Sequence, residues 1–312
     1  MNKLAIFSGN AHPELAKKIC DFLKVKLSDA FVSRFSEGEI RVKINDNVRG
    51  KDVFIVQPTC PPTNENIMEL LIMMDALRRA SSQRITVVMP YFGYARQDRK
   101  DQPRVPITAK LVANLLTTAG ADRVLTMDLH AGQIQGFFDI PVDHLFSVGV
   151  FTDYFTSLDI KDLVIVSPDV GGIKTARAYA KRFGVPLAII DKRRESPEKT
   201  EAMHILGTVE GRNAIIVDDL VATGSSLFEA VEALKKAGAK NVYAAIAHGV
   251  LSGEAIERLD KCTYLKELVI TDSIPLPKTK EHPRIKVLTV ANLLGEAIKR
   301  IHNEESVSCL FD

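Results

Sequence analysis

The feature that most constrains the fold is a series of short apolar runs, rich in Val, Ile and Leu, spaced along the chain. They occupy residues 53–56, 85–89, 124–127, 163–166, 187–190, 214–217, 242–247 and 268–270. Most are continuously apolar rather than alternating. Strands that are covered on both faces have this pattern, whereas half-exposed strands alternate between apolar and polar residues. The runs therefore predict buried strands of mainly parallel sheets.

Helical patterns lie between many of these runs. One covers residues 65–80 and a second covers residues 226–237, which is followed by Gly238, a residue type that often ends helices. The predicted buried face of the first helix consists of Ile67, Leu70, Leu71, Met74 and Leu77. Its methionines are expected to fill core space. Alternation of strands and helices predicts an α/β fold.

A diverged internal repeat suggests how the 312 residues are divided. The strand, loop, helix, turn and strand that start at residue 52 match a similar stretch that starts at residue 213. One interpretation is that the match means little, because any two α/β units look alike at this level. The other interpretation is that the chain contains two similar domains. We expect domains over residues 1–145 and 146–289, because a chain of this length usually forms two. The amphipathic tail over 290–301 can pack on either domain, and we assign 290–312 to the first.

Composition narrows the function classes. The chain has 41 Lys and Arg residues against 39 Asp and Glu, which argues against a nucleic-acid-binding protein. The first ten residues do not resemble a signal peptide, and no apolar stretch approaches the roughly 20 residues that span a bilayer. Four scattered cysteines, Cys20, Cys60, Cys262 and Cys309, lack metal-site spacing. We expect a cytoplasmic protein with no membrane or nucleic-acid partner.

The strongest chemical motif follows the strand at 214–217. Two acids, Asp218 and Asp219, lead into a small hydroxyl-rich turn and then a helix, and the donors there are Thr223, Gly224, Ser225 and Ser226. Backbone N–H groups and hydroxyls at a helix start suit a phosphate, and the acids can accept hydrogen bonds from sugar hydroxyls. The alternative is a well-capped helix with no ligand, in which Ser225 or Ser226 is the cap. That alternative does not account for the paired acids, so we expect a sugar-phosphate site.

Other motifs fit phosphates less specifically. The P-loop and the Gly-x-Gly-x-x-Gly pattern are both absent, which counts against ordinary P-loop kinases and nicotinamide dehydrogenases. Arg96, Gln97 and Arg99 follow a strand and a Tyr-Phe-Gly-Tyr turn. A fork of guanidinium donors there suits nucleotide phosphates, and a salt-bridged surface loop is the alternative. Lys192, Arg193 and Arg194 precede a polar, aperiodic segment, 195–201, that we expect to be a mobile loop.

Residues 217–226 resemble the 5-phosphoribosyl-diphosphate loop of the type I phosphoribosyltransferase fold. Five further blocks, at 35–40, 90–99, 126–136, 167–172 and 191–194, occur in order with it. Together they resemble the bacterial class I ribose-phosphate pyrophosphokinases over nearly the whole chain. The resemblance implies two phosphoribosyltransferase-like domains, each with a mainly parallel sheet flanked by helices. It also implies transfer of the diphosphate of ATP to C1 of ribose 5-phosphate, with Mg²⁺ bound to the nucleotide.

The same resemblance implies residue roles. Lys192 and Arg194 would be catalytic, on a loop that closes over the diphosphate. Residues implied in ATP binding are Arg96, Gln97 and Arg99, with Phe35, Glu37 and Glu39 reaching the adenine bound by a neighbouring subunit. His130 and Asp169 would contact the magnesium–ATP complex. Such a shared site implies self-association, as a dimer at least, and the family implies a hexamer.

Two places depart from the family pattern. Ala222 stands where most members have a third acid, and Ser225 stands where a second glycine is common. The stretch 100–104, which resembles the family's effector loop, is one residue shorter, with Pro103 where serine is common. Candidate allosteric residues, by resemblance, are Arg49, Gln135, Ser306, Ser308 and Phe311, and inorganic phosphate and ADP are the candidate effectors.

Two other functions remain open at this point. A phosphoribosyltransferase would share the 218–226 motif and would consume the diphosphate sugar rather than make it. That class does not account for Arg96, His130 and Lys192 together. A non-catalytic subunit of the same family is the second alternative, and it should have lost catalytic positions that this chain retains.

Overall fold

The computed structural model describes residues 3–193 and 202–311. The chain forms two compact units. The first contains the chain up to Phe146, Ser273–Pro275 and the chain from Thr289 onward, and the second contains Ser147–Asp272 and Leu276–Leu288. None of the helices in the described ranges is both long enough and apolar enough to cross a membrane.

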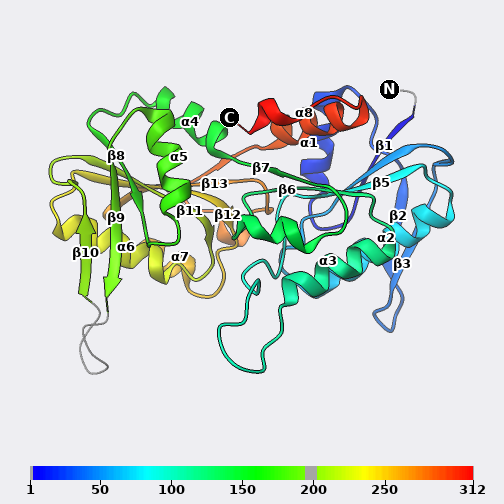
Figure 1. The fold of residues 1–312 in the computed structure, drawn as a ribbon, viewed down its shortest axis with the longest axis horizontal. Coiled ribbons are helices and arrows are strands. Elements are labelled where there is room, and N and C mark those ends of the chain that lie inside the picture. Colours follow the sequence, from blue (N-terminus) through cyan, green and yellow to red (C-terminus); the bar gives the residue numbers. More distant parts are fainter. Residues whose placement is uncertain (1–2, 194–201, 312) are drawn as a thin grey trace. The chain divides into compact units, whose positions relative to one another are not determined.

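The first unit is built on a five-stranded parallel sheet (Figure 1). Its strands, in spatial order, are β1 (Leu4–Ser8), β4 (Asp52–Val56), β5 (Arg84–Met89), β6 (Arg123–Met127) and β7 (Val142–Leu145). Each neighbouring pair is parallel. The helices of this unit are α1 (Pro13–Leu23), α2 (Thr63–Arg79), α3 (Thr108–Ala119) and α8 (Ala291–His302), with 3-10 turns η1 (Gly132–Phe137) and η3 (Ser308–Leu310). Every residue of β4 is buried, as the uninterrupted apolar run predicts.

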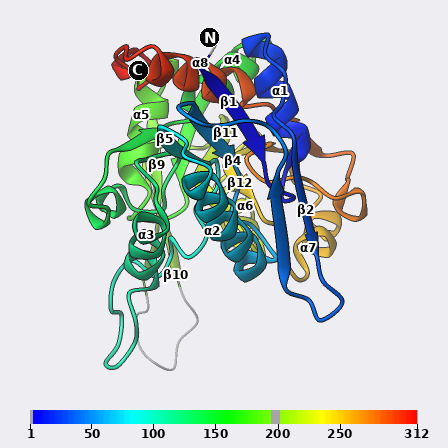
Figure 2. The same cartoon turned by 90° about the vertical axis from the view of Figure 1, so that its right-hand side faces the viewer.

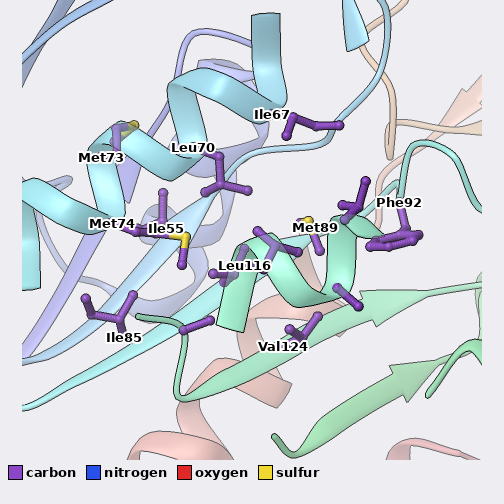
Figure 3. Close-up of a cluster of buried hydrophobic side chains, with 14 of the residues drawn as sticks. Ile55, Ile67, Leu70, Met73, Met74, Ile85, Met89, Phe92, Leu116 and Val124 are labelled. Carbon is purple, nitrogen blue, oxygen red and sulfur yellow. The ribbon is translucent and has the colours of Figure 1, made fainter. Parts of the chain in front are cut away.

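One hydrophobic core cluster of this unit lies between the sheet and helices α2 and α3. Figure 3 shows Leu70 and Met74 of α2 beside Ile55 of β4, with Leu116 of α3 nearby. Met73 and Met74 are fully buried, as expected of core filler, whereas the prediction was wrong for Met68, which is 51% exposed. Leu71 of the predicted face is partly buried and packs against this core, and Met73 is buried in addition to the residues predicted.

Helix α8 packs against α1 in the first unit, where Gly295 lies so close to Phe22 that an added Cβ would come within 2.5 Å of the ring. A polar cluster ties the end of α8 to the sheet. Arg84 donates two hydrogen bonds to the Asp52 carboxylate, at 2.8 and 2.6 Å, and one to the Ile301 carbonyl at 3.0 Å. Nδ1 of His302 lies 2.8 Å from the same carboxylate. We call Asp52, Arg84 and His302 the α8 clamp.

An antiparallel hairpin, β2 (Ala30–Arg34) and β3 (Ile40–Ile44), also belongs to the first unit. The apolar runs did not predict it, because its strands are half-exposed and contain charged residues. Its turn extends beyond the ends of both strands (Figure 2). The hairpin therefore presents the 35–39 turn to solvent.

The second unit is built on a seven-stranded sheet. In spatial order the strands are β10 (Ala202–Leu206), β9 (Leu187–Arg193), β8 (Leu163–Ser167), β11 (Asn213–Val221), β12 (Asn241–Gly249), β13 (Leu265–Thr271) and β14 (Ile285–Leu288). All pairs are parallel except β10 with β9. Its helices are α4 (Val148–Ser157), α5 (Ile173–Phe183), α6 (Ser225–Lys236) and α7 (Ala255–Lys261), with the 3-10 turn η2 (Lys278–Lys280). The predicted α/β class with mainly parallel sheets is confirmed.

The two halves of the sequence repeat have the same local structure. β4, α2 and β5 form a parallel strand–helix–strand unit in the first unit, and β11, α6 and β12 form one in the second. β11 is longer than β4 and continues through both acids to Val221. This extension brings Asp218 and Asp219 to the carboxyl end of the sheet, where ligands of open α/β sheets bind.

Candidate phosphate and nucleotide sites

The turn between β11 and α6 has the geometry of a phosphate cradle. Gly224 takes the N-cap position of α6 with φ at 77°, in the left-handed region, and no side chain caps the helix. A Cβ at Gly224 would lie 2.5 Å from the Phe228 ring, so glycine is required for space as well as for conformation. The alternative of a Ser-capped helix is wrong, because Ser225 and Ser226 are the first two helical residues. The first-turn N–H groups of α6 thus have no capping side chain, an arrangement that suits an anion.

Hydroxyl groups surround this helix start. Thr223 Oγ1 lies 3.3 Å from Ser225 Oγ, and Thr223 and Ser226 are exposed. The backbone of Ala222 accepts a hydrogen bond from the Ser252 N–H at 3.0 Å, which fixes the other side of the turn. The structure thus brings the predicted Thr223, Gly224, Ser225 and Ser226 together as one group of donors.

The paired acids lie next to this cradle. Burial, the charge of Asp219 and a hydrogen bond with Asp219 raise the pKa of Asp218 well above its ordinary value, and the charge of Asp169 acts in the same direction. The Asp219 N–H, which donates to Asp218 Oδ1 at 2.9 Å, acts in the opposite direction. Two carboxyl groups this close can hold one proton between them, and they can accept hydrogen bonds from neighbouring sugar hydroxyls.

Asp169 follows β8, the strand that pairs directly with β11. Its Oδ1 accepts a hydrogen bond from the Gly172 N–H at 2.8 Å, and its carbonyl accepts one from the Ser167 hydroxyl at 2.7 Å. An added Cβ on Gly172 would come within 2.9 Å of that hydroxyl. This tight turn holds an exposed carboxylate near Asp218, so the acids of two neighbouring strand ends face one region of the second unit.

Lys192 lies within β9, which continues past the predicted run to Arg193 and pairs antiparallel with β10. The strand end predicted at residue 190 was therefore too early, because pairing with β10 extends the strand into the polar residues. Arg194 and the segment 195–201 lie outside the described residues.

In the first unit, Arg96 and Gln97 line a pocket of about 550 Å³ together with Thr63, Asn64, Tyr91, Tyr94 and Ala95. The pocket combines the start of α2 with the turn after β5. Gly93 allows the close approach of these segments, since an added Cβ would lie 2.4 Å from the Thr59 carbonyl. Tyr94 donates a hydrogen bond to Asn64 across the pocket. Aromatic rings beside a guanidinium group and an open helix start suit a nucleotide or its phosphates.

Gln97 is fixed by its neighbours, whereas Arg99 is not part of this pocket. The Gln97 side-chain oxygen accepts a hydrogen bond from the Thr108 hydroxyl at 2.6 Å, and its carbonyl accepts one from the Ala109 N–H at 3.2 Å. Arg99 is exposed on the loop that leads to α3. The structure therefore groups Arg96 with Gln97.

Phe35, Glu37 and Glu39 all lie in the exposed turn of the β2–β3 hairpin. The Arg41 guanidinium lies 5.6 Å from the Phe31 ring centroid and 5.5 Å from that of Phe35, within cation–π range. Hydrogen bonds from its own N–H and from the Ser36 hydroxyl lower the pKa of Glu37. An exposed aromatic ring with two carboxylates is available to a second molecule.

His130 is exposed three residues beyond the end of β6, in the first unit. The predicted metal residues thus belong to different units, with Asp169 in the second. Within the described residues there is no group of three or more His, Cys, Asp or Glu side chains placed to hold a metal.

The candidate allosteric residues all belong to the first unit. Ser306 Oγ donates to Ser308 Oγ at 3.0 Å, and Phe311 follows on the same exposed tail. Arg49 and Gln135 are exposed on other segments, and 100–104 is an exposed loop before α3. Sequence reasoning had given no role to Asn64, Tyr91 or Tyr94 individually. The aromatic turn at 91–94 was the available signal for the two tyrosines.

The fold and these residues define an α/β protein with paired acids and an uncapped helix start at the carboxyl end of a parallel sheet. Residues 4–120 match the N-terminal domain of ribose phosphate pyrophosphokinase, and residues 192–312 match the phosphoribosyl synthetase-associated domain. The chain belongs to the ribose-phosphate pyrophosphokinase family.

Individual relatives agree over the whole length. The chain is 55% identical to the ribose-phosphate pyrophosphokinase of Campylobacter jejuni over 311 residues, which is 100% of both chains. It is 54% identical to that of Bacillus subtilis, covering 99% of this chain and 97% of the relative. A crystal structure of phosphoribosylpyrophosphate synthetase from Mycobacterium smegmatis superimposes with a TM-score of 0.91 at 42% identity, covering 97% of this chain and 99% of that one.

Proposed function

We propose that this chain transfers the diphosphate group of ATP to the C1 hydroxyl of ribose 5-phosphate, giving 5-phosphoribosyl 1-diphosphate and AMP, for nucleotide biosynthesis. The observation that carries the proposal is the junction of β11 and α6. There the adjacent Asp218 and Asp219 lead directly into a turn whose helix start has no capping side chain. The cradle fits the 5-phosphate, and the acids fit the ring hydroxyls.

The nucleotide side of the reaction is assigned to other residues. Arg96, Gln97 and Arg99 bind the phosphates of ATP, and Phe35, Glu37 and Glu39 of a neighbouring subunit bind its adenine. The pocket supports the assignment of Arg96 and Gln97, the resemblance alone supports that of Arg99, and the exposure of the hairpin turn supports the adenine contact. This arrangement requires at least a dimer, and we propose the hexamer of the family.

The reaction is a displacement at the β-phosphorus of ATP. The anomeric oxygen of the sugar forms the new bond, the bond to the α-phosphate oxygen breaks, and AMP leaves. The hydroxyl proton is released. Because the sugar oxygen attacks the phosphorus directly, no residue becomes covalently attached. Lys192 and Arg194 hold the diphosphate and offset the negative charge that builds on its oxygens.

Mg²⁺ is the metal that we propose for the nucleotide, with His130 and Asp169 as the protein contacts. When bound, Mg²⁺ supplies positive charge to the phosphoryl oxygens. The fixed turn that presents the Asp169 carboxylate supports this role. The free thiols of Cys20, Cys60, Cys262 and Cys309 support a cytoplasmic location.

Regulation is proposed for the first unit. Inorganic phosphate would activate and ADP would inhibit through Arg49, Gln135, Ser306, Ser308 and Phe311. The contact between Ser306 and Ser308, which gathers two hydroxyls on one tail, supports an anion site. Inhibition by ADP that does not follow simple competition with ATP is the expected result.

Incubation of the purified protein with Mg²⁺, ATP and ribose 5-phosphate tests the activity. AMP and the diphosphate sugar should appear in equal amounts, and inorganic phosphate should raise the rate. Consumption of added diphosphate sugar with a nucleobase, and no synthesis from ATP, would instead identify a phosphoribosyltransferase. Absence of both activities would favour a non-catalytic subunit.

A further inference from the structure

A buried histidine in the first unit has no place in the function proposed so far. His144 lies in β7 with 4% of its surface exposed. Its Nε2 accepts a hydrogen bond from the Leu129 N–H at 2.9 Å. Its Nδ1 lies 3.3 Å from the amide nitrogen of Gln135, and its ring centroid lies 4.5 Å from that of Phe146. The hydrogen bond at Nε2, the Gln135 amide beside Nδ1 and the tilted Phe146 ring together hold the imidazole in one orientation.

The segment that His144 contacts leads to His130. β6 and β7 are parallel neighbours, and the Asp128 N–H still donates to the Leu145 carbonyl at 3.0 Å. At Asp128 the backbone turns out of the strand with φ at 41°, in the left-handed region that a non-glycine residue rarely adopts. The next N–H, that of Leu129, belongs to a buried residue and bonds to His144. The hydrogen bond to His144 therefore helps to fix the chain just before His130.

The residue type at position 144 follows from that bond. A strand position in a buried sheet is ordinarily filled by an apolar side chain. The buried Leu129 N–H needs an acceptor. Because the chain turns out of the strand at Asp128, this N–H no longer faces the backbone carbonyls of β7. An imidazole reaches from β7 to the Leu129 N–H, which an apolar side chain of the same size could not satisfy.

We propose that His144 is a positioning residue for the nucleotide half of the reaction, and that it acts by fixing the 128–130 segment from which His130 projects. The inference rests on the proposed function, from which it takes the role of His130. His144 itself touches no substrate. Its contribution resembles that of the outer residues that orient the ligands of a metal.

Replacement of His144 by Leu and by Gln tests the proposal. Leu keeps the buried volume and removes the acceptor, whereas Gln places an amide oxygen near the position of Nε2. For His144→Leu we expect kcat over KM for magnesium–ATP to fall about 10- to 100-fold, the usual effect of losing an outer contact of a metal ligand. KM for ribose 5-phosphate, whose proposed residues are all in the second unit, should stay within about twofold. His144→Gln should recover most of the loss.

Val142→Ala, in the same strand, is the control for a general loss of stability. It should lower the melting temperature without separating the two substrates kinetically. If His144→Leu does not fold, comparison of His144→Gln with His144→Asn tests the proposal instead. The shorter Asn side chain cannot reach the Leu129 N–H, so His144→Asn should show the larger loss in kcat over KM for magnesium–ATP. Equal kinetics for Gln and Asn, or a parallel rise in both KM values, would overturn the inference.

The two proposals fail in different ways. A wild-type protein that makes no AMP from ATP and ribose 5-phosphate contradicts the proposed function. An active wild type whose His144→Leu variant has unchanged kinetics contradicts only the role of His144.

Discussion

At the scale of single residues, the site combines groups that favour binding with groups that cost stability. Gly224 and Asp218 are examples in the second unit. Gly224 adopts a positive φ that suits the cradle, and Asp218 keeps a carboxyl group where burial and neighbouring acids oppose its charge. Functional sites commonly retain such unfavourable features.

The raised pKa of Asp218 gives a testable dependence of stability on pH. Above pH 3.8, the ordinary pKa of an Asp carboxyl group, Asp218 loses its proton in the unfolded state but keeps it in the folded state. The free energy of unfolding of the wild type therefore falls as pH rises from that value through the folded pKa. We expect Asp218→Asn to raise stability at neutral pH by about 1 kcal/mol, with the gain vanishing toward acid pH.

Thermal unfolding of Asp218→Asn across the pH range provides the measurement. Asp153→Asn, at an exposed position of the same unit, is the control and should have little effect. The stabilised variant should have a higher KM for ribose 5-phosphate. A gain that persists unchanged at low pH would contradict the explanation.

Lys192→Ala is expected to separate binding from turnover. If Lys192 holds the transferring diphosphate, kcat should fall by about 100-fold or more, as on loss of other preorganised donors. Ribose 5-phosphate affinity, measured by calorimetry without ATP, should change little. Equal losses in affinity and turnover would argue against a role in the transition state.

At the scale of secondary-structure elements, the junction of β11 and α6 depends on glycine. Gly224→Ala adds a methyl group 2.5 Å from the Phe228 ring and places alanine at a positive φ. We expect KM for ribose 5-phosphate to rise about 10-fold or more, since small displacements of positioning groups have large kinetic effects. Gly211→Ala shares the positive φ but meets no atom within 4 Å, so it should cost only stability.

The α8 clamp is a second prediction at this scale. Arg84→Leu leaves the carboxylate of Asp52, whose side chain is only 10% exposed, without its bidentate partner. We expect a loss of about 3 kcal/mol in the free energy of unfolding of the first unit. Arg79→Leu is the matched control, because the Arg79–Asp75 pair is exposed and should contribute less than about 1 kcal/mol. Urea unfolding of both variants compares them directly.

The sequence pattern predicted strands whose side chains are buried and apolar. It missed polar strands that are held mainly by hydrogen bonds to a neighbouring strand. The continuous apolar runs located β4, β5, β6, β8, the first part of β9, β11, β12 and β13, because strands buried on both faces leave that signal. The β2–β3 hairpin and the extension of β9 were missed, since their polar residues are held by neighbouring strands. The 218–226 motif was found because its donors are contiguous. The Asn64–Tyr94 contact joins residues far apart in sequence and was not predictable from spacing.

At the scale of the whole molecule, subunit sharing of the ATP site gives a direct experiment. Phe35→Ala removes the proposed adenine contact, and His130→Ala removes the proposed metal contact, so each variant alone should be nearly inactive. If the two contacts of one site come from different subunits, random mixing makes about a quarter of the sites intact. Activity of the remixed variants should therefore rise toward that fraction of the wild-type rate.

For this test the two variant oligomers are dissociated, mixed and reassembled. Mixing them without dissociation is the control, and it should show no recovery of activity. Recovery that never exceeds the sum of the separate variants would place both contacts on one chain. The experiment also requires self-association, which size-exclusion chromatography with light scattering measures independently.

The α8 clamp has a consequence for synthesis on the ribosome. The strands that contain Asp52 and Arg84 emerge first, and the helix that packs on α1 and bonds to Arg84 follows only after the whole second unit. The first unit therefore cannot reach its finished form before the second unit has been translated. A product that terminates before α8 is left with an uncovered apolar surface and without the His302 part of the α8 clamp. Proteases can recognise such features and degrade incomplete chains while sparing complete ones.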